Sequence, residues 1–202
     1  MSKSASSKKS NIVAFYEVHD AQYGLLSPLS PTPLVVRHVQ YPSLHHYFLC
    51  ERFKDTPAEQ WILEATTVWS LDRLVKTAEA EGYQRSNWNK VKVDVMLLGT
   101  YLKFKQNEAA RAVLLNTQAA LLLYHTTTDD FWGDGGDGKG KNVLGTVTMA
   151  ARSRLLADQE RQQQLLQQQQ QSSLPQPQQP PSSKRGEAST RAVKVGAGAA
   201  RA

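Results

Sequence analysis

The residue types best suited to ligand chemistry gather in one glycine-rich stretch, FWGDGGDGKGKN, which runs from Phe131 to Asn142. Five of its twelve residues are glycine, and glycine permits positive φ angles and close approach of the backbone to a ligand. A tryptophan supplies a flat apolar face at one end, and two lysines follow at the other. The stretch predicts a cradle for a sugar or a nucleotide, and the alternative is an ordinary surface turn.

Three known motifs fit this stretch poorly. Gly133 to Lys139 has P-loop spacing, but Gly140 stands where a P-loop needs Ser or Thr to hold magnesium. A calcium loop beginning at Asp134 would close on a glutamate at its twelfth residue, which is Gly145 here. A Rossmann fingerprint requires a surrounding βαβ unit, and the sequence pattern supplies none. We therefore expect no nucleotide cofactor of these kinds and no calcium.

A second cluster, YPSLHHYFLC, spans Tyr41 to Cys50. His46 and Cys50 are four residues apart, which is a permissible spacing for a metal on one helix face, but no second pair of ligands lies nearby in the sequence. We expect no metal site. Cys50 is more typical of a small buried apolar residue, and a lone histidine on such a helix is more typical of a hydrogen-bonded core group than of a catalyst.

The elements that must position these clusters follow from the apolar periodicity. Short strands are predicted near residues 12–16, 34–40 and 121–124, and we expect the second to pair with the first. Three prolines between residues 24 and 33 predict an extended, ordered loop. Helical spacing appears in six segments, 43–53, 58–65, 70–81, 89–105, 108–117 and 143–167. The predicted fold is α+β and predominantly α-helical, with a few short strands.

Length and composition predict one domain, residues 11–158, between two disordered tails. The chain has 202 residues, and a body of roughly 150 residues buries about 70% of the surface its unfolded chain exposes. Residues 1–10 form a basic tail. Residues 159–202 form a Gln/Pro-rich, basic, low-complexity tail whose beginning can continue the last helix, and such composition buries too little apolar area to fold alone.

The net charge of +6 comes from these tails. The first ten residues carry three lysines, and from Arg161 onward six basic residues face one acidic residue, so the middle carries −2. This distribution argues against a base-reading nucleic-acid domain and leaves weak, salt-sensitive contact through the tails. No apolar run approaches the roughly 20 residues of a membrane helix, and no secretory signal precedes the domain. We expect an intracellular protein, cytoplasmic by default, with the nucleus as the alternative.

With both clusters in view, the chain resembles the NADAR (YbiA-like) N-glycosidase family. The resemblance covers residues 11–156, and it is carried in order by Phe15-Tyr16, Asp20, Tyr23-Gly24, Tyr41-Pro42, His46-Tyr47-Phe48, Asn87-Trp88, Lys103-Phe104, His125, Asp129, WGDGGDGKGKN and Leu144-Gly145. It implies a single YbiA-like domain. It also implies hydrolysis of an N-glycosidic bond, in ribosylamino-pyrimidine intermediates of riboflavin synthesis or in ADP-ribose attached to guanine.

The sequence departs from the family pattern at positions that bear on catalysis. Where the family reads S-E-H-Y-F, this chain reads Leu44 to Phe48, and His45 replaces the glutamate. Glycosidases generally use a pair of carboxylates. A neutral imidazole can act as a general base, but it offers no negative charge to a developing sugar cation. The family's F-S-N-F becomes Leu26 to Leu29, with a proline in place of the asparagine.

The resemblance implies the roles of individual residues. Asp134 would stabilise the sugar cation and His45 would stand in for the catalytic base, while Trp132 would stack on the ligand. Arg52, Lys139 and Lys141 would meet phosphate. The remaining expected contacts are Gly133, Gly135, Gly136, Asp137, Asn142, His46, Tyr47 and Asp129.

Two functional hypotheses follow, and no cofactor is implied by either. The first is an N-glycosidase-type domain, active or inactivated by the change at His45. The alternative is a non-catalytic module that binds ADP-ribose or a nucleotide and uses its tail for protein contacts. A third reading, a nucleic-acid factor driven by the basic tails, would rest on the tails alone.

Overall fold

The computed structural model describes residues 11–173. The disorder predicted for the first ten residues, and for residues 174–202 of the C-terminal tail, lies outside the described residues. The chain divides into two units, one ending at Gln164 and the other beginning at Leu165. The core and the candidate site belong to the first unit.

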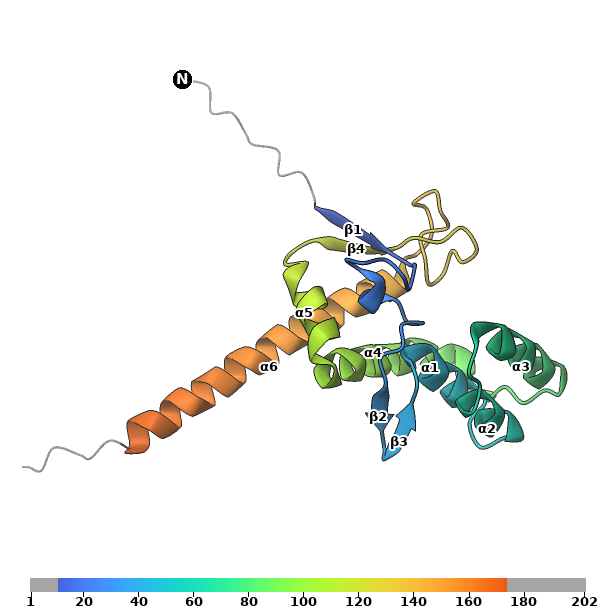
Figure 1. The fold of residues 1–202 in the computed structure, drawn as a ribbon, viewed down its shortest axis with the longest axis horizontal. Helices are drawn as coiled ribbons and strands as arrows, with labels where there is room; N and C mark the ends of the chain where they lie inside the picture. The colour runs from blue at the N-terminus through green and yellow to red at the C-terminus, as the bar shows by residue number, and fades with distance from the viewer. Residues whose placement is uncertain (1–10, 174–202) are drawn as a thin grey trace, which may run out of the picture. The chain divides into compact units, whose positions relative to one another are not determined.

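The described part of the chain is mostly helical, as the sequence predicted (Figure 1). The helices are α1 (Leu44–Arg52), α2 (Pro57–Leu63), α3 (Val68–Ala80), α4 (Trp88–Gln106), α5 (Glu108–Asn116) and α6 (Val143–Ser173), with a 3-10 turn at Gly24–Leu26. The strands are β1 (Ile12–Phe15), β2 (Leu34–Val36), β3 (Val39–Tyr41) and β4 (Leu121–Tyr124). The α+β, predominantly α-helical class is confirmed.

The strand pairing differs from the expected one. Residues 34–40 do not pair with the first strand; they form the antiparallel hairpin β2–β3. Arg37 and His38 connect its strands with φ angles of 49° and 71°, and two central residues with positive φ are what a tight type I′ hairpin turn requires. The partner of β1 is β4, in parallel register from Ile12 opposite Leu121 to Phe15 opposite Tyr124.

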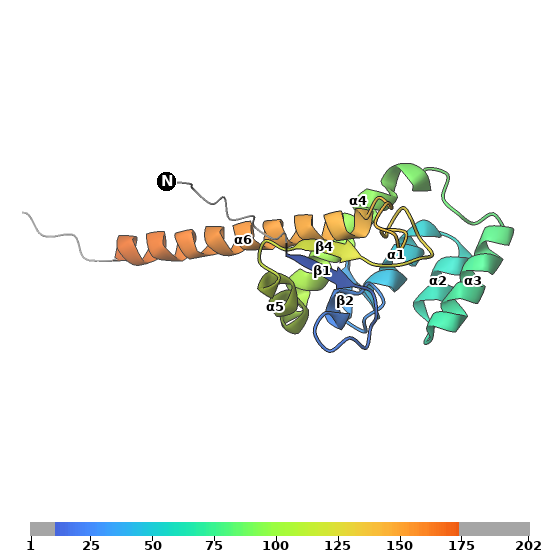
Figure 2. The same cartoon turned by 90° about the horizontal axis from the view of Figure 1, so that it is seen from above.

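Helix α4 lies at the centre of the fold. It contacts α1, α5 and β2, and α2 packs between α1 and α3, an arrangement visible from two directions in Figures 1 and 2. Gly99 lets α1 and α4 approach closely, because a Cβ there would lie 2.5 Å from Tyr47 Cδ1 and 2.6 Å from Leu44 Cδ1. The apolar faces of these helices thus form the core into which Phe53 and Phe104 are fully buried.

Helix ends follow local sequence signals. Ser43 caps α1 by accepting a hydrogen bond from the backbone N–H of His46, and Thr67 and Ser70 form a reciprocal capping box at the start of α3. Gly82, predicted to end α3, has φ +71°. The N–H of Gly82 bonds to Glu79 O and that of Tyr83 to Ala78 O, the two bonds of a Schellman motif.

A fully buried lysine on α4 holds the proline-containing loop 24–33 in place. Lys103 on α4 donates from Nζ to Ser27 O at 2.6 Å and to Ser30 Oγ at 2.8 Å. Burial lowers the pKa of Lys103 to about 7, because the charged form loses hydration. The loop predicted to be extended and ordered is therefore held by α4.

Between residues 11 and 173, no helix combines the length and the apolar character needed to cross a bilayer.

Candidate functional site

A small pocket of about 110 Å³ brings together residues from separate parts of the first unit. Its wall comes from the proline loop, α1, α4, the end of β4, the following loop and the first turn of α6. The lining residues are Pro28, His45, Phe48, Met96, Tyr124, Asp129, Trp132 and Leu144. Three of the residues expected to contact a ligand, His45, Asp129 and Trp132, therefore face one cavity.

Asp129 supplies the carboxylate of this pocket. Its Oδ1 accepts the backbone N–H of Phe131 at 2.9 Å and that of Trp132 at 2.7 Å, the pattern by which Asp closes a tight turn. No hydrogen bond from residues 11–173 reaches the other oxygen, Oδ2. The turn thus fixes the carboxylate through one oxygen, and the second has no hydrogen-bond partner among residues 11–173.

The indole of Trp132 stands between two other aromatic rings. It meets Phe48 of α1 edge-on, with 5.3 Å between centroids and an interplanar angle of 89°, and Phe131 at 5.0 Å and 89°. Edge-to-face contacts of this kind favour a fixed ring orientation. The pocket therefore presents a flat, rigid apolar surface.

His45 lies in the first turn of α1 and is half-buried. Its backbone N–H donates to Pro28 O at 3.0 Å, which ties the helix to the proline loop. Burial, with a smaller effect of neighbouring His46, lowers the pKa of His45 to about 4 against an opposing effect of Asp72. The imidazole is therefore neutral at pH 7, and its ring makes no hydrogen bond to any other described residue.

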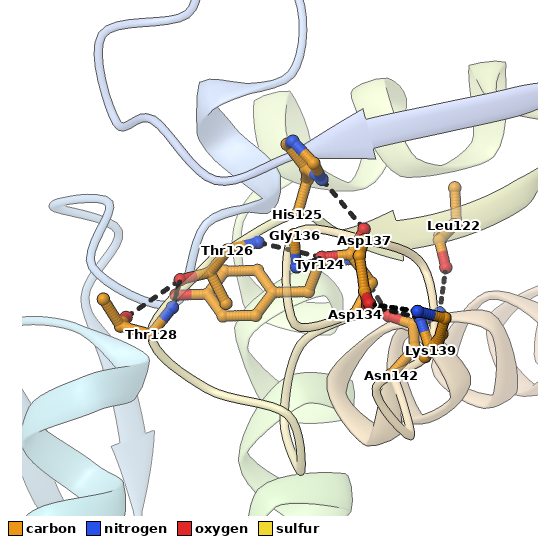
Figure 3. Close-up of polar contacts among 10 residues, drawn as sticks. All are labelled: Leu122, Tyr124, His125, Thr126, Thr128, Asp134, Gly136, Asp137, Lys139 and Asn142. Atoms are coloured by element: carbon orange, nitrogen blue, oxygen red, sulfur yellow. Dashed lines mark hydrogen bonds and ion pairs between the residues drawn. The ribbon is translucent and has the colours of Figure 1, made fainter.

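The structure places Asp134 differently. It is 2% exposed and does not line the pocket. Figure 3 shows its carboxylate turned into its own loop: Oδ2 meets His125 Nδ1 at 2.8 Å, and Oδ1 accepts the N–H groups of Thr126 at 3.1 Å and Gly136 at 3.0 Å. Burial raises the pKa of Asp134, but the hydrogen bonds from His125, Gly136 and Thr126 outweigh it and the pKa lies below its usual value.

Asn142 ties the far end of the glycine-rich loop to β4. Its Oδ1 accepts the N–H of Tyr124 at 2.9 Å and its Nδ2 donates to Leu122 O at 2.8 Å, so the side chain takes the place of a neighbouring strand (Figure 3). The side chain therefore bonds to the chain itself rather than facing the pocket.

The glycines of the loop make room for protein backbone. A Cβ at Gly133 would lie 2.8 Å from Asp129 O, and one at Gly140 would lie 2.5 Å from Gly133 O. Gly135 and Gly136 have φ angles of +72° and +78°, which favour glycine. None of these four residues lines the pocket, so the sequence signal marked a tightly folded loop beside the pocket.

The remaining charged residues of the loop lie on its surface. Lys139 Nζ pairs with Asp137 Oδ2 at 2.8 Å, and both are exposed. Lys141 Nζ lies 5.5 Å from the centroid of the Phe131 ring. Of these residues, Lys141 is the one whose side chain reaches toward an aromatic neighbour of Trp132.

Three expected contact residues on α1 point elsewhere. His46 Nδ1 meets Ser43 Oγ at 2.7 Å and Nε2 meets Ala65 O at 3.1 Å; it lines a neighbouring pocket of about 320 Å³ with Ser43 and Leu71. Tyr47 is 2% exposed and packs edge-on against Tyr41 in the core. Arg52, at the other end of the helix, pairs with Glu79 at 2.5 Å.

The residues considered for a metal site are engaged in the fold. The fully buried Cys50 donates from Sγ to Glu59 O at 3.5 Å, and burial raises its pKa to about 12. Among residues 11–173, no group of three or more His, Cys, Asp or Glu side chains is arranged to hold a metal ion.

Several pocket residues were not expected to contact a ligand. Met96, Tyr124 and Leu144 enter the pocket because α4, β4 and α6 meet there, and Pro28 enters it from the proline loop, at the position where the family pattern has an asparagine. Tyr124 ends β4 and Leu144 opens α6, directly on either side of the glycine-rich loop. Their positions at those boundaries are the signal that could have indicated them.

The chain is similar to known proteins in sequence and in fold. The chain is 35% identical over 148 residues to the N-glycosidase YbiA of Escherichia coli, covering 73% of this chain and 91% of that protein. It is 35% identical to a riboflavin biosynthesis protein of Vibrio vulnificus, covering 71% of this chain and 38% of that protein. The NMR structure of E. coli YbiA superimposes with a TM-score of 0.65 at 34% identity, over 74% of this chain and 88% of that one.

The family assignment follows from the extent of the match. The NADAR domain matches residues 14–156, a range that includes every residue lining the pocket. The chain therefore belongs to the NADAR domain family.

Proposed function

We propose that this domain hydrolyses the N-glycosidic bond of a ribosylated base, in the pocket of His45, Asp129 and Trp132. The observation that carries the proposal is a carboxylate with one unengaged oxygen beside a rigid tryptophan ring in a cavity of about 110 Å³. The names of the relatives, N-glycosidase and riboflavin biosynthesis protein, agree with this chemistry. Asp129 takes the role that the sequence suggested for Asp134.

Cleavage of a C1′–N bond leaves positive charge on the sugar. The Asp129 carboxylate would oppose that charge as it develops, which is the form of stabilisation most useful in a partly desolvated site. Water then adds its hydroxyl to C1′, and the departing base leaves with a proton. Trp132 would hold the base or the sugar by its flat face.

His45 is suited to a different part of the reaction. With a pKa of about 4, its neutral imidazole is a weak general base at pH 7, because catalytic efficiency is greatest when the pKa lies near the working pH. It can still accept or relay a hydrogen bond from water or from the base. Because the neutral imidazole offers no negative charge to the developing sugar cation, the proposed enzyme is slower than one with a carboxylate at this position.

The test is release of free base, followed by chromatography, from a ribosylamino-pyrimidine phosphate and from guanine-linked ADP-ribose. Wild type should release base from at least one of them, and Asp129→Asn should lower the rate by roughly 100-fold or more. Asp130→Asn is the matched control, because that neighbouring carboxylate is exposed and does not line the pocket. Equal rates for the two variants would contradict the role of Asp129.

A non-catalytic module that binds ADP-ribose or a nucleotide is the second candidate, and the observation favouring it is His45 itself. The residue replaces the glutamate of the family pattern and is held neutral, so the pocket holds a single carboxylate, that of Asp129. Calorimetric binding of ADP-ribose by a wild type that releases no base from either substrate would establish this candidate and reject the first.

A further inference from the structure

The two outer edges of the β1–β4 sheet are finished differently. The sheet has two parallel strands, so each strand has one edge without a strand partner. On the β4 edge, Asn142 accepts the N–H of Tyr124 at 2.9 Å and donates to Leu122 O at 2.8 Å, and the N–H of Asp134 donates to Tyr124 O at 3.0 Å. The glycine-rich loop therefore closes the β4 edge.

The edge of β1 is open. Phe15 O accepts the N–H of His125 at 3.2 Å, so Phe15 directs its backbone groups toward β4. Because successive residues of a strand direct these groups to opposite edges, the N–H and C=O groups of Ile12 and Ala14 point away from β4. Among residues 11–173, none bonds to them, and both residues are exposed. An open edge of this kind is a template for a further strand.

Strand β1 lacks the features that usually protect an edge. Lysine, proline or a bulge on the edge strand discourages pairing with another chain, and the strand, IVAF, contains neither lysine nor proline. Ile12 is 53% exposed and Leu121, its partner on β4, is 42% exposed. The open edge therefore borders an exposed apolar surface.

The order of charges along the chain indicates which strand fits this edge. Lys8 and Lys9 precede β1 and Glu17 follows it; Glu17 is exposed and has no ion-pair partner among residues 11–173. A second β1 strand running antiparallel brings the acidic end of one copy to the basic end of the other. A parallel copy would place like charges side by side, which is unfavourable.

We propose that β1 pairs antiparallel with β1 of a second copy of this chain, forming a four-stranded sheet with a twofold axis at Val13. Ile12 then exchanges both of its backbone hydrogen bonds with Ala14 of the second copy, and Lys9 stands opposite Glu17. The same patch serves on both copies, as a twofold interface requires. A strand of four residues offers less than the roughly 1,200–2,000 Å² of a standard interface, so the dimer is weak and forms on concentration.

The direct test is amide hydrogen exchange, followed by NMR on the full chain at about 20 μM and about 500 μM, which brackets a weak dimer. The N–H groups of Ile12 and Ala14 should exchange at least tenfold more slowly at the higher concentration. Those of Val13 and Phe15, which face β4, should change less than twofold and serve as the internal control. Sedimentation equilibrium on the same samples measures the Kd of the dimer.

Variants test the geometry of the pair. Ala14→Pro removes an outward N–H without removing a bond to β4, and it should raise the Kd at least tenfold. Lys9→Glu and Glu17→Lys should each raise the Kd three- to tenfold at low ionic strength, and the double variant should restore the wild-type Kd. Glu160→Lys is the matched control, because it makes the same charge change at an exposed residue of α6.

A wild type that is monomeric at both concentrations overturns the inference, even if an unrelated extended peptide binds the β1 edge. A dimer in which exchange at Ile12 and Ala14 is unchanged overturns it as well, because the contact then lies elsewhere. Equal weakening by Glu160→Lys and Glu17→Lys, or no recovery in the charge-exchanged double variant, rejects the antiparallel pair. If thermal unfolding shows that Ala14→Pro does not fold, the charge-exchange series decides alone.

Discussion

The turn around Asp129 and the loop around Asp134 are neighbours in sequence, and a carboxylate organises each of them. In the turn, one oxygen of Asp129 accepts two backbone N–H groups and the other stays unengaged at the pocket. In the loop, both oxygens of Asp134 are engaged, with Thr126, Gly136 and His125. The same residue type, five positions apart, therefore has one oxygen unengaged at a pocket in one region and both oxygens engaged by the fold in the other.

The comparison teaches that engagement of both carboxylate oxygens, rather than the residues flanking the aspartate, distinguishes the two environments: each aspartate accepts two backbone N–H groups, but only Asp134 has its second oxygen engaged, by His125. Asp134 has the glycines and the tryptophan beside it that suggest a ligand site. Both of its oxygens are engaged inside the protein, however, and the residue is 2% exposed, so its carboxylate is closed to a ligand in the pocket.

The largest expected effect is on stability and separates the two carboxylates directly. Asp134→Ala removes three hydrogen bonds and leaves buried N–H groups without partners, so we expect the free energy of unfolding to fall by about 3 kcal/mol. Asp129→Ala, at a half-buried position, should cost about 1 kcal/mol. Urea unfolding measures both. Equal losses in the free energy of unfolding for the two variants would contradict the different roles given to Asp129 and Asp134.

Acidification should first lower the stability of the protein through protonation of His45 and His46 on α1. Burial lowers the pKa of both His45, to about 4, and His46. Their contribution to stability is complete above the unfolded pKa of about 6.5 and is lost as pH falls toward 4, because the unfolded chain binds protons first. His45 alone can account for up to about 3 kcal/mol of this loss.

The measurement is the urea midpoint between pH 7 and pH 4 for wild type and His45→Asn. The variant should show a shallower decline, with His46 accounting for the remainder. An unchanged slope would mean that His45 is protonated as readily in the folded protein as in the unfolded chain.

A carboxylate at position 45 would give the pocket a second carboxylate facing Asp129. Two carboxylates in one site push their pKa values apart, so that one can donate a proton while the other stays ionised. His45→Glu should therefore raise base release at pH 7 at least tenfold, about 1.4 kcal/mol in barrier. In wild type, if the neutral imidazole takes part, the rate should fall on acidification near pH 4 rather than near 6.5. Identical rates for wild type, His45→Glu and His45→Ala would show that the position takes no part.

The smallest expected effect is the loss of ligand affinity when Trp132, in the apolar wall of the pocket, is replaced. Trp132→Ala should weaken binding of ADP-ribose about tenfold, or 1.4 kcal/mol, because the ring provides the flat surface beside Asp129. Trp61→Ala is the control, since Trp61 is 37% exposed, meets Tyr83 in a tilted ring contact and does not line the pocket. Calorimetry on both variants, with thermal unfolding to verify the fold, tests the point. Equal affinities of the two variants for ADP-ribose would show that the ligand does not contact Trp132.

Local signals in the sequence predicted the helices well. Gly82 ended α3 where a positive φ was needed, and helical apolar spacing at Val91, Val95, Leu98 and Leu102 located α4. That stripe was expected to be the buried face, but Leu98 is 39% exposed and the buried residues of α4 include Trp88, Met96 and Phe104 instead. The pairing of β1 with β4 could not be predicted in this way, because more than 100 residues separate Phe15 from Tyr124. The hairpin was also missed, since Arg37 and His38 lack the Asn-Gly type of sequence that usually marks a type I′ turn.

The candidate site was predictable in part for the same reason. His45, Asp129 and Trp132 were named from sequence and share one pocket. Sequence could not indicate that Asp134 faces inward, because its donors, His125, Thr126 and Gly136, are assembled only when the loop folds. Met96 belongs to the pocket through packing of α4, and an apolar residue on a helix is equally typical of the core.

The buried Lys103 beside the proline loop can report how often that loop opens. The burial that lowers the pKa of Lys103 to about 7 also keeps its amine away from any acylating reagent in solution. With no solvent contact, the amine reacts only while the loop at Ser27 and Ser30 is lifted away. The rate at which Lys103 is acylated therefore reports how often the proline loop, residues 24–33, opens.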